Sequence, residues 1–301
     1  MRVFVTGASG HIGSAVVPEL LGAGHEVVGL ARSAQSAAAV EALGAQAYRA
    51  DMADPDALRE PAAGADAVVH LAFDHATLAA GDFPAAVRTD LAVVRALGDA
   101  LAGGPGSGSG AQKTFVGIGL TPTGDPASDA AFQANPRSAV AREIVGFAER
   151  GVRPLLMAVP PVTHSARDRH GFIPMMIRVA RERGVSGYVD EGANHWPAVH
   201  TEDLARLFRL ALEKAPAGVP LIGAAEEGIE VRTIAEAIGR RLGLPTASIP
   251  AERAAEHFTG FQFAALDVVM PNASTRELLG WEPVGPGLLA ELEDGHYFDA
   301  A

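Results

Sequence analysis

Residues 3–13 read Val3-Phe4-Val5-Thr6-Gly7-Ala8-Ser9-Gly10-His11-Ile12-Gly13. The apolar start is typical of a strand that ends at Thr6, and helical spacing begins at about His11. Gly7 permits a tight turn, Gly10 lets the backbone approach a pyrophosphate, and Gly13 lets the helix pack closely on the sheet. The helix N-terminus offers amide donors and a positive dipole end to phosphates. The stretch predicts a dinucleotide-binding turn, rather than a glycine-rich turn without a ligand, and the expected cofactor contacts are Gly7, Ser9, Gly10, His11, Ile12 and Gly13.

Short apolar runs separated by segments of helical spacing continue this pattern along the first half of the chain. The runs are Val27–Leu30, Ala45–Tyr48, Ala67–Leu71, Phe115–Ile118 and Leu155–Val159. Runs that are apolar on both faces are typical of parallel strands covered by helices on each side. Strand–helix alternation therefore predicts an α/β fold, a doubly wound parallel sheet of the Rossmann type, over residues 1–160.

A different pattern follows Pro160, where proline and histidine become frequent and helical segments dominate. The predicted helices are Ile173–Arg183, Thr201–Lys214, Val231–Leu242 and Leu288–Glu293, and the runs Gly187–Val189, Val219–Ile222 and Ala247–Ile249 could add strands. We expect residues 161–301 to form a smaller, mainly helical substrate lobe, with some segments returning to the large sheet. In open α/β sheets the ligand binds at the carboxyl ends of the strands, so we expect the site there.

The composition excludes several classes of protein. Apolar residues make up 48% of the chain and charged residues 20%, which is too apolar for a disordered chain. The net charge of −12 argues against binding nucleic acid, whose phosphates an acidic surface repels. Without cysteine, disulfides and thiolate chemistry are impossible. The first apolar run is too short for a signal peptide or a membrane span, so a cytoplasmic protein with no membrane association is expected.

The end of the second predicted strand bears on the choice between NAD and NADP. An NAD-binding chain normally places Asp or Glu there to hold the ribose 2′-hydroxyl, but this chain has Ala31 followed by Arg32 and Ser33. A guanidinium pairs bidentately with a 2′-phosphate, and a serine hydroxyl can add a hydrogen bond. We therefore expect NADP(H) to be preferred over NAD(H), unless Arg32 is only a solvated loop charge.

Several motifs resemble the extended and atypical short-chain dehydrogenase/reductases, the NAD(P)-dependent epimerase/dehydratase group. They are TGASGHIG at residues 6–13, Asp51-Met52, His70-Leu71-Ala72, VHTEDLA at residues 199–205 and RELLGWEP at residues 276–283. The resemblance spans nearly the whole chain. It implies that Asp51 and Met52 contact adenine, and that Leu71, Ala72 and Phe73 pass beside the adenine ribose and the pyrophosphate.

The resemblance fails at the residues that would carry the chemistry. The family uses a Ser or Thr after the fifth strand and a Tyr-x-x-x-Lys pair on the next helix. Here the hydroxyl position falls on Ile118, with Thr121 and Thr123 nearby as substitutes. The tyrosine and lysine positions fall on Asn135 and Ala139, or in a register shifted by three on Ser138 and Arg142. A mechanism that depends on a tyrosine acid is therefore not expected.

Other side chains could supply the missing acid. A histidine is the best proton donor near neutral pH, and His164 is our first choice, with His170 as a substrate contact and Asp168 able to orient either. Arg137 or Arg142 could stabilise an oxyanion or anchor a phosphate, although as surface charges on a helix they need no function. Arg137 joins His164 in the candidate catalytic set, which Thr121 and Asn135 complete. Each histidine could equally be part of a solvated loop. Tyr188 and Trp196 could line the substrate lobe or serve as core residues. No spacing matches a zinc signature, so no metal is expected.

The sequence thus predicts an NADP-dependent oxidoreductase that acts on a small carbonyl or alcohol without the Tyr-x-x-x-Lys pair. The alternatives are a sensor that binds NADPH without turnover and a non-redox enzyme of the epimerase/dehydratase kind. The resemblance also implies a possible homodimer, in which the helices at Ala85–Leu101 and Ser138–Arg150 form a four-helix contact. The apolar stripe Val140, Ile144, Val145 and Ala148 would face the partner, or else the chain's own sheet.

Overall fold

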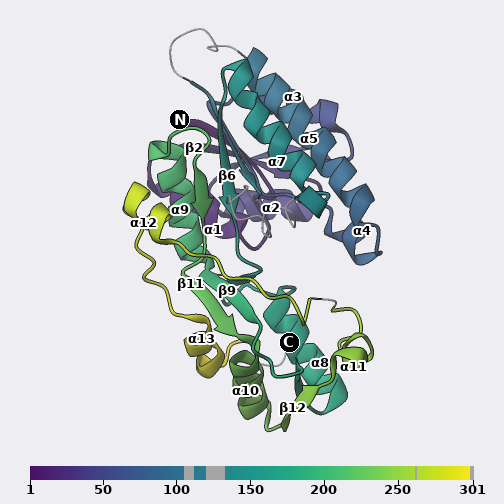
Figure 1. The fold of residues 1–301 in the computed structure, drawn as a ribbon. Helices are drawn as coiled ribbons and strands as arrows, with labels where there is room; N and C mark the ends of the chain where they lie inside the picture. Colours follow the sequence, from purple (N-terminus) through teal and green to yellow (C-terminus); the bar gives the residue numbers. More distant parts are fainter. Residues whose placement is uncertain (105–111, 120–132, 262, 299–301) are drawn as a thin grey trace. The chain divides into compact units, whose positions relative to one another are not determined.

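The computed structural model describes residues 1–104, 112–119, 133–261 and 263–298 (Figure 1). They form two compact units. Unit 1 comprises Met1–Ala158, Ala205–Leu221 and Thr275–Trp281, and unit 2 comprises Val159–Leu204, Ile222–Ser274 and Glu282–Ala301. The first break lies beside Pro160, and two later segments return to unit 1. The candidate residue Thr121 lies outside the described residues.

Unit 1 is built on a seven-stranded sheet in the order β10-β6-β5-β4-β1-β2-β3. Its strands are β1 (Arg2–Thr6), β2 (Glu26–Ala31), β3 (Gln46–Arg49), β4 (Ala67–His70), β5 (Thr114–Ile118), β6 (Arg153–Ala158) and β10 (Pro220–Ile222). Strands β1 to β6 pair in parallel. The chain runs outward from β1 through β2 to β3, and then outward the other way from β4 through β5 to β6. The doubly wound prediction is confirmed, and the order reverses between β1 and β4.

Helices connect these strands. They are α1 (Gly13–Gly22), α2 (Ala34–Ala42), α3 (Arg59–Ala63), α4 (His75–Ala79), α5 (Phe83–Gly103), α7 (Ser138–Gly146), α9 (Thr201–Lys214) and α12 (Ala273–Leu279), with short 3-10 turns at Pro55–Leu58 and Phe147–Arg150. Figure 1 shows α3, α5 and α7 side by side on one face of the sheet. Helix α9 is tied to α1 by the ion pair between Arg209 and Glu19.

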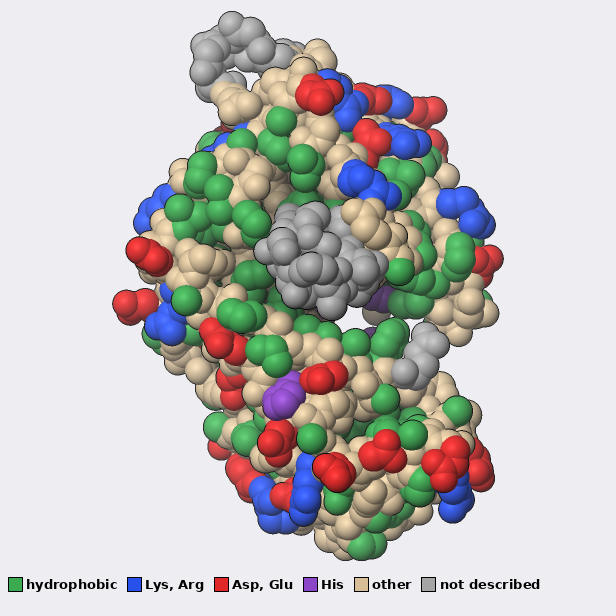
Figure 2. Space-filling model, in the orientation of Figure 1, with side chains coloured by type: hydrophobic (Ala, Val, Ile, Leu, Met, Phe, Trp, Pro, Cys, Tyr) green, Lys and Arg blue, Asp and Glu red, His purple; other side chains and the backbone are tan. Residues whose placement is uncertain are grey.

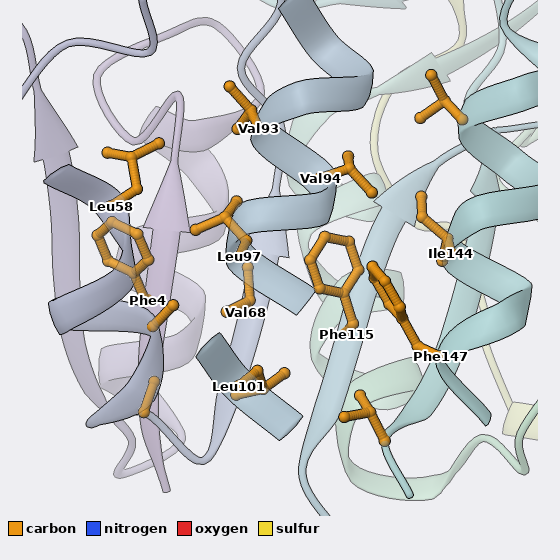
Figure 3. Packing of buried hydrophobic residues seen from close by; sticks show 14 of the residues in the cluster. Phe4, Leu58, Val68, Val93, Val94, Leu97, Leu101, Phe115, Ile144 and Phe147 are labelled. Carbon is orange, nitrogen blue, oxygen red and sulfur yellow. The ribbon is translucent and has the colours of Figure 1, made fainter. Parts of the chain in front are cut away.

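The core of unit 1 lies between the sheet and helices α5 and α7 (Figure 3). Phe4, Val68 and Phe115 come from three neighbouring strands and pack toward Leu97 on α5. Phe115 also contacts Phe147, with their ring centroids 5.0 Å apart. Aromatic and branched side chains of this size supply most of the free energy of burial, at about 25 cal/mol per Å² of apolar surface. The core therefore fixes α5 and α7 against the strands whose ends carry the candidate site.

The predicted apolar stripe of α7 divides between this core and the surface. Val140 and Ile144 are buried in the core of unit 1, whereas Val145 is 45% exposed. Two of the four stripe residues thus face the chain's own sheet, whereas Val145 and Ala148 are exposed. On the outer face, Glu143 forms ion pairs with Arg95 of α5 and with Arg150. The homodimer stays a prediction.

Unit 2 holds two small sheets, one in the order β11-β9-β7 and one pairing β12 with β8. Its elements are β7 (Val162–His164), β8 (Ser186–Val189), β9 (His195–His200), β11 (Glu226–Glu230), β12 (Thr246–Ile249), α8 (Phe172–Arg183), α10 (Val231–Leu242), α11 (Ala251–His257) and α13 (Leu288–Asp294). Two of the short runs that could add strands do so here, as β8 and β12. The third, Val219–Ile222, returns to the large sheet as β10.

The surface is acidic without being uniform. Figure 2 shows acidic side chains lying between basic ones over the face in view. Among the described residues, no helix has both the length and the apolar composition that crossing a membrane requires.

Candidate cofactor and active site

In the glycine-rich turn after β1, backbone segments from the ends of β1 and β4 and the start of α1 lie very close together. Gly7 has a φ of +69°, and the N–H of Gly10 donates to the carbonyl of Gly7 at 2.9 Å. A Cβ atom built on Gly13 would lie 2.1 Å from the carbonyl oxygen of Gly7, and one built on Gly7 would lie 2.9 Å from the amide nitrogen of Ala72. Side chains are thus excluded where the ends of β1 and β4 meet the start of α1. This shape fits the pyrophosphate-binding turn that the sequence predicts.

Helix α1 begins at Gly13 rather than at about His11. The difference arises because residues 7–10 close a separate hydrogen-bonded turn before the helix. Ser9 and Gly10 are exposed on that turn, and His11 and Ile12 are half-buried. These residues border the turn as a phosphate-binding loop requires, and their contacts with a cofactor stay a prediction.

The end of β2 carries cations and no carboxylate. Ala31 ends the strand and is buried, and Arg32 follows it and is exposed. The register of the sheet pairs Ala31 with Arg49 of β3, so a second exposed cation lies at the same strand end. The hydroxyl of Ser33 accepts from the N–H of Ser36 at 3.0 Å and caps α2. The N-terminus of α2 therefore begins beside Arg32, where its dipole favours an anion.

The predicted adenine contacts lie after the third strand. Asp51 is exposed, and its carboxylate accepts from the N–H of Ala53 at 3.0 Å. Met52 is half-buried and packs against the core of unit 1. The role of Asp51 and Met52 as adenine contacts stays a prediction.

A buried polar chain runs between the ends of β1 and β4 and helix α5. The Thr6 hydroxyl lies 2.7 Å from Nδ1 of His70, and Nε2 of His70 lies 2.9 Å from Oδ1 of Asp90. The N–H groups of Leu71 and Ala72 both donate to the same Thr6 hydroxyl, each at 3.2 Å. The residues predicted to pass beside the pyrophosphate are thus held by the last residue of β1.

Arg137 extends this chain at the start of α7. Its Nη2 donates to Oδ2 of Asp90 at 3.4 Å, and its guanidinium carbon lies 4.7 Å from the centre of the Phe73 ring. The side chain of Asn135 accepts from the N–H of Arg137 at 2.9 Å. The structure thus brings the predicted residues Phe73, Asn135 and Arg137 together in unit 1. The cation is the residue of this group that can stabilise a negative charge.

His75 also lies beside Phe73, with the ring centroids 5.5 Å apart. Partial burial lowers the pKa of His75, and the charge of Arg137 lowers it further. This imidazole is therefore neutral near pH 7 and able to accept a proton. His75 is not among the candidate residues that the sequence indicates.

The tyrosines of the chain make contacts with residues other than those that surround Arg137. The hydroxyl of Tyr48 donates to the carbonyl of Ala57 at 3.1 Å. Tyr297 donates to Asp168 at 3.2 Å, and burial together with the charges of Asp168 and Glu291 raises its pKa. Tyr188 is half-buried on β8, with the guanidinium of Arg232 lying 5.6 Å from its ring centre. A phenol whose pKa is raised is a poorer proton donor, so Tyr297 does not restore the missing acid.

His164 lies in a buried cluster of unit 2. Its Nδ1 is 2.6 Å from Oε2 of Glu291, and Nε2 of His200 is 3.3 Å from the other oxygen of the same carboxylate. Burial raises the pKa of Glu291, but hydrogen bonds and charges from the two histidines outweigh it and lower the pKa to about 2. His164 is fully buried, so it would have to leave this cluster to reach a substrate. These contacts favour a structural role for His164, and its role as proton donor stays a prediction.

The remaining substrate candidates are dispersed within unit 2. His170 is exposed, whereas Asp168 is buried and accepts from the N–H of Gly171 at 2.8 Å. Trp196 is fully buried, packs against Phe172, and donates from Nε1 to the carbonyl of Leu266 at 3.0 Å. The core alternative for Trp196 therefore fits its surroundings better than a substrate contact does.

Asp90 and Glu291 were missed by the sequence analysis, although each carries a recognisable signal. Asp90 lies three residues after Val87 and four before Val94, on the apolar face of a helix. Glu291 lies between Leu288 and Leu292 in the same way. A carboxylate on the buried face of a helix costs free energy unless it is paired, so such a position points to a buried partner.

The comparisons with known proteins agree with the turn and the fold. Residues 3–103 match the NAD dependent epimerase/dehydratase family. An uncharacterised protein of Schizosaccharomyces pombe is 42% identical over 99% of this chain and 100% of its own length. The 2′-dehydrokanamycin reductase of Streptomyces kanamyceticus is 28% identical over 88% of this chain and 74% of its own.

Solved structures share the fold. The UDP-glucuronic acid 4-epimerase of Bacillus cereus, solved with UDP-glucuronic acid and NAD, matches with a TM-score of 0.73 and 16% identity, covering 99% of this chain and 98% of that one. The UDP-glucose 4-epimerase of Thermus thermophilus, solved with NAD, matches with a TM-score of 0.71 and 19% identity over 100% of both chains. The glycine turn, the strand order and these matches agree, and the chain belongs to the NAD-dependent epimerase/dehydratase family of enzymes, the extended short-chain dehydrogenase/reductases.

Proposed function

We propose that the chain is an NADP-dependent oxidoreductase that acts on a small carbonyl or alcohol without a Tyr-x-x-x-Lys pair. The observation that carries the proposal is Arg137, a cation held by the buried carboxylate of Asp90 beside Phe73. In the register that puts the family's lysine position at Ala139, Arg137 is a cation two residues away at the start of α7. The reductase among the relatives supports a redox reaction.

The preference for NADP rests on the charges at the ends of β2 and β3. Arg32 and Arg49 are both exposed there, and the N-terminus of α2 adds its dipole. Asp74 lies within electrostatic reach of Arg32, and hydrogen bonds from Thr77, together with that charge, lower its pKa. Arg32 and Arg49 are two cations that would attract a 2′-phosphate.

The chemistry that this chain's residues can perform follows from their contacts. The nicotinamide supplies or accepts a hydride when it is bound. Arg137 stabilises the negative charge that develops on the substrate oxygen during carbonyl reduction. His75, neutral near pH 7, accepts the proton of the alcohol in the oxidation direction and returns it in the reduction. Asn135 holds the N–H of Arg137 and so fixes the start of α7.

Arg32→Ala is expected to weaken NADPH binding about 10- to 100-fold and to leave NADH binding within threefold, because only the 2′-phosphate contact is removed. Arg59→Ala is the control, since Arg59 is an exposed cation paired with Asp56 on a neighbouring segment. Fluorescence titration with both cofactors measures the change. Equal losses for NADPH and NADH would contradict the assignment of Arg32.

Turnover is tested with a panel of carbonyl compounds while the oxidation of NADPH is followed. Keto-sugars come first in the panel because one relative is a 2′-dehydrokanamycin reductase and the two matched structures are UDP-sugar 4-epimerases. Consumption of NADPH with one of them supports the oxidoreductase. Tight NADPH binding with no consumption on any carbonyl would favour the sensor or the non-redox enzyme instead.

His75→Gln is expected to lower kcat at least about tenfold, as loss of a general acid–base group does, and to leave the Kd for NADPH within threefold. His164→Gln is the paired variant, and its expected effect is a lower Tm with kcat retained, because His164 lies in the buried cluster of unit 2. If His164→Gln folds and is inactive while His75→Gln is active, the proton donor is His164.

A further inference from the structure

The hydrogen bonds that link Thr6, His70, Asp90 and Arg137 form a buried series in which donors and acceptors can be assigned. Thr6 already accepts two hydrogen bonds, from the N–H groups of Leu71 and Ala72. A hydroxyl has one hydrogen to donate, and that hydrogen is directed at Nδ1 of His70, 2.7 Å away. Nδ1 is then the accepting nitrogen, so the proton of the neutral ring lies on Nε2.

The proton on Nε2 determines the direction of the next hydrogen bond in the series. Nε2 of His70 donates to Oδ1 of Asp90 at 2.9 Å. The second oxygen of Asp90 accepts from Nη2 of Arg137 at 3.4 Å. Each oxygen of the carboxylate thus has its own donor, one from the sheet and one from α7. The carboxylate joins the end of β4 to the cation of the proposed site.

Asp90 occupies a position where an apolar residue would otherwise be expected. It is 1% exposed and lies on the α5 face that buries Val87, Val94 and Leu97. Desolvating a carboxylate costs several kcal/mol, and pairing it with charged partners often only offsets that cost. A valine or leucine would pack there without the penalty. The presence of the Asp90 carboxylate at this buried position therefore indicates a role other than packing.

Arg137 is held on one side and open on the other. Its side chain is 31% exposed, and its guanidinium lies over the face of Phe73. Asp90 and the aromatic face together restrict a side chain that otherwise has several rotatable bonds. The remaining N–H groups of the guanidinium fork can then be presented in a fixed orientation.

We propose that Asp90 is the positioning residue of Arg137, and that Thr6 and His70 hold Asp90 so that the guanidinium serves as the fixed cation in place of the family's lysine. This inference rests on the proposed function, because it assigns Arg137 to the substrate oxygen. The same series of hydrogen bonds connects Arg137, through Thr6, to the amides of Leu71 and Ala72. These amides follow the end of β4, which is expected to contact the cofactor.

The test is a double-mutant cycle of Asp90→Asn, Arg137→Ala and the double variant, with kcat, KM and the Kd for NADPH measured for each. We expect Arg137→Ala to lower kcat about 100-fold, and Asp90→Asn to lower it about tenfold with the Kd for NADPH within threefold. The double variant should be no slower than Arg137→Ala, because Asp90 acts through Arg137. The proposal would be overturned if the losses in kcat of the two single variants multiplied in the double variant, or if Asp90→Asn left kcat unchanged.

Rescue by free guanidinium separates positioning from packing. Added guanidinium at about 50 mM, well below denaturing concentration, is expected to restore part of the kcat of Arg137→Ala and none of the double variant, since the carboxylate is the binding site for the guanidinium. Equal rescue of both variants would contradict the proposal. Asp99→Asn is the control for Asp90, since Asp99 is on the same helix and pairs with Arg150 at the surface. Arg95→Ala is the control for Arg137, since Arg95 is an exposed cation that pairs with Glu143 of α7.

Two measurements do not depend on turnover. The ¹⁵N shifts of His70 in the unaltered protein, assigned with a His70→Gln variant, should report the Nε2–H tautomer, and an Nδ1–H tautomer would overturn the proposed chain. If the wild-type protein consumes no NADPH with any carbonyl, the proposed function fails. The effect of Asp90 on Arg137 is then measured by the ¹⁵Nε relaxation of the Arg137 side chain, which should report a more mobile side chain in Asp90→Asn than in wild type. Unchanged relaxation would overturn the proposal that Asp90 positions Arg137.

Discussion

A Gly13→Ala variant is expected to lose at least about 100-fold in NADPH affinity, which corresponds to about 2.7 kcal/mol. The new Cβ atom would lie 2.1 Å from the carbonyl oxygen of Gly7 and 2.8 Å from Cα of Ala8. Both neighbours are backbone atoms, so they can yield only if α1 moves away from the turn. That movement displaces the amide donors that would bind the pyrophosphate.

Gly22→Ala is the matched control for Gly13→Ala. Gly22 is the last residue of the same helix, and a Cβ atom there meets nothing within 4 Å. Because alanine is the better helix former by about 1 kcal/mol, this variant should keep its NADPH affinity and gain slightly in Tm. Fluorescence titration and thermal unfolding measure both variants. NADPH binding by Gly13→Ala within threefold of wild type would mean that the cofactor is bound elsewhere.

The second large effect is expected at Glu291. Its pKa is lowered from 4.5 to about 2, and a group with a lowered pKa stabilises the folded state above its unfolded pKa. The contribution at pH 7 is about 3 kcal/mol, at 1.36 kcal/mol for each unit of pKa. Glu291→Gln should lower the free energy of unfolding of unit 2 by this amount. The difference from wild type should be full above about pH 4.5 and should disappear as the pH falls toward 2.

Tryptophan fluorescence can report unit 2 by itself. Trp196 is buried in unit 2 and Trp281 in unit 1, so a Trp281→Phe background leaves Trp196 as the probe. Urea unfolding of this background and of its Glu291→Gln derivative, between pH 3 and pH 7, measures the difference. Glu293→Gln is the control, since Glu293 lies on the same helix and pairs with Arg240 while more than half exposed. A difference that is equal for both variants, or that does not depend on pH, would contradict the assignment.

The fold of unit 1 could be predicted because its signals are local. The spacing of apolar residues gives the strands and helices, and Gly7, Gly10 and Gly13 encode a turn whose geometry depends on the absence of side chains. Helix α9 and helix α10 begin and end at the predicted residues. The returning strand β10 was visible only as a short apolar run. Its place beside β6 depends on pairing with a segment more than 60 residues away.

The candidate site could be predicted only in part, for the same reason. Arg137 was selected from its place on a helix, but its partner Asp90 is 47 residues earlier and looked like an interruption in an apolar stripe. His164 looked like a free donor in a loop rich in titratable groups. The structure places it against Glu291, 127 residues later, where His164 is fully buried.

The sequence by itself determined the α/β class, the dinucleotide turn and the absence of the Tyr-x-x-x-Lys pattern. These features depend on neighbouring residues, on periodicity and on the excluded volume of a Cβ atom. Only the tertiary structure decided which charges meet. An ion pair or a buried hydrogen bond joins residues that are distant in the chain, and its free energy depends on burial and distance, which no local pattern contains.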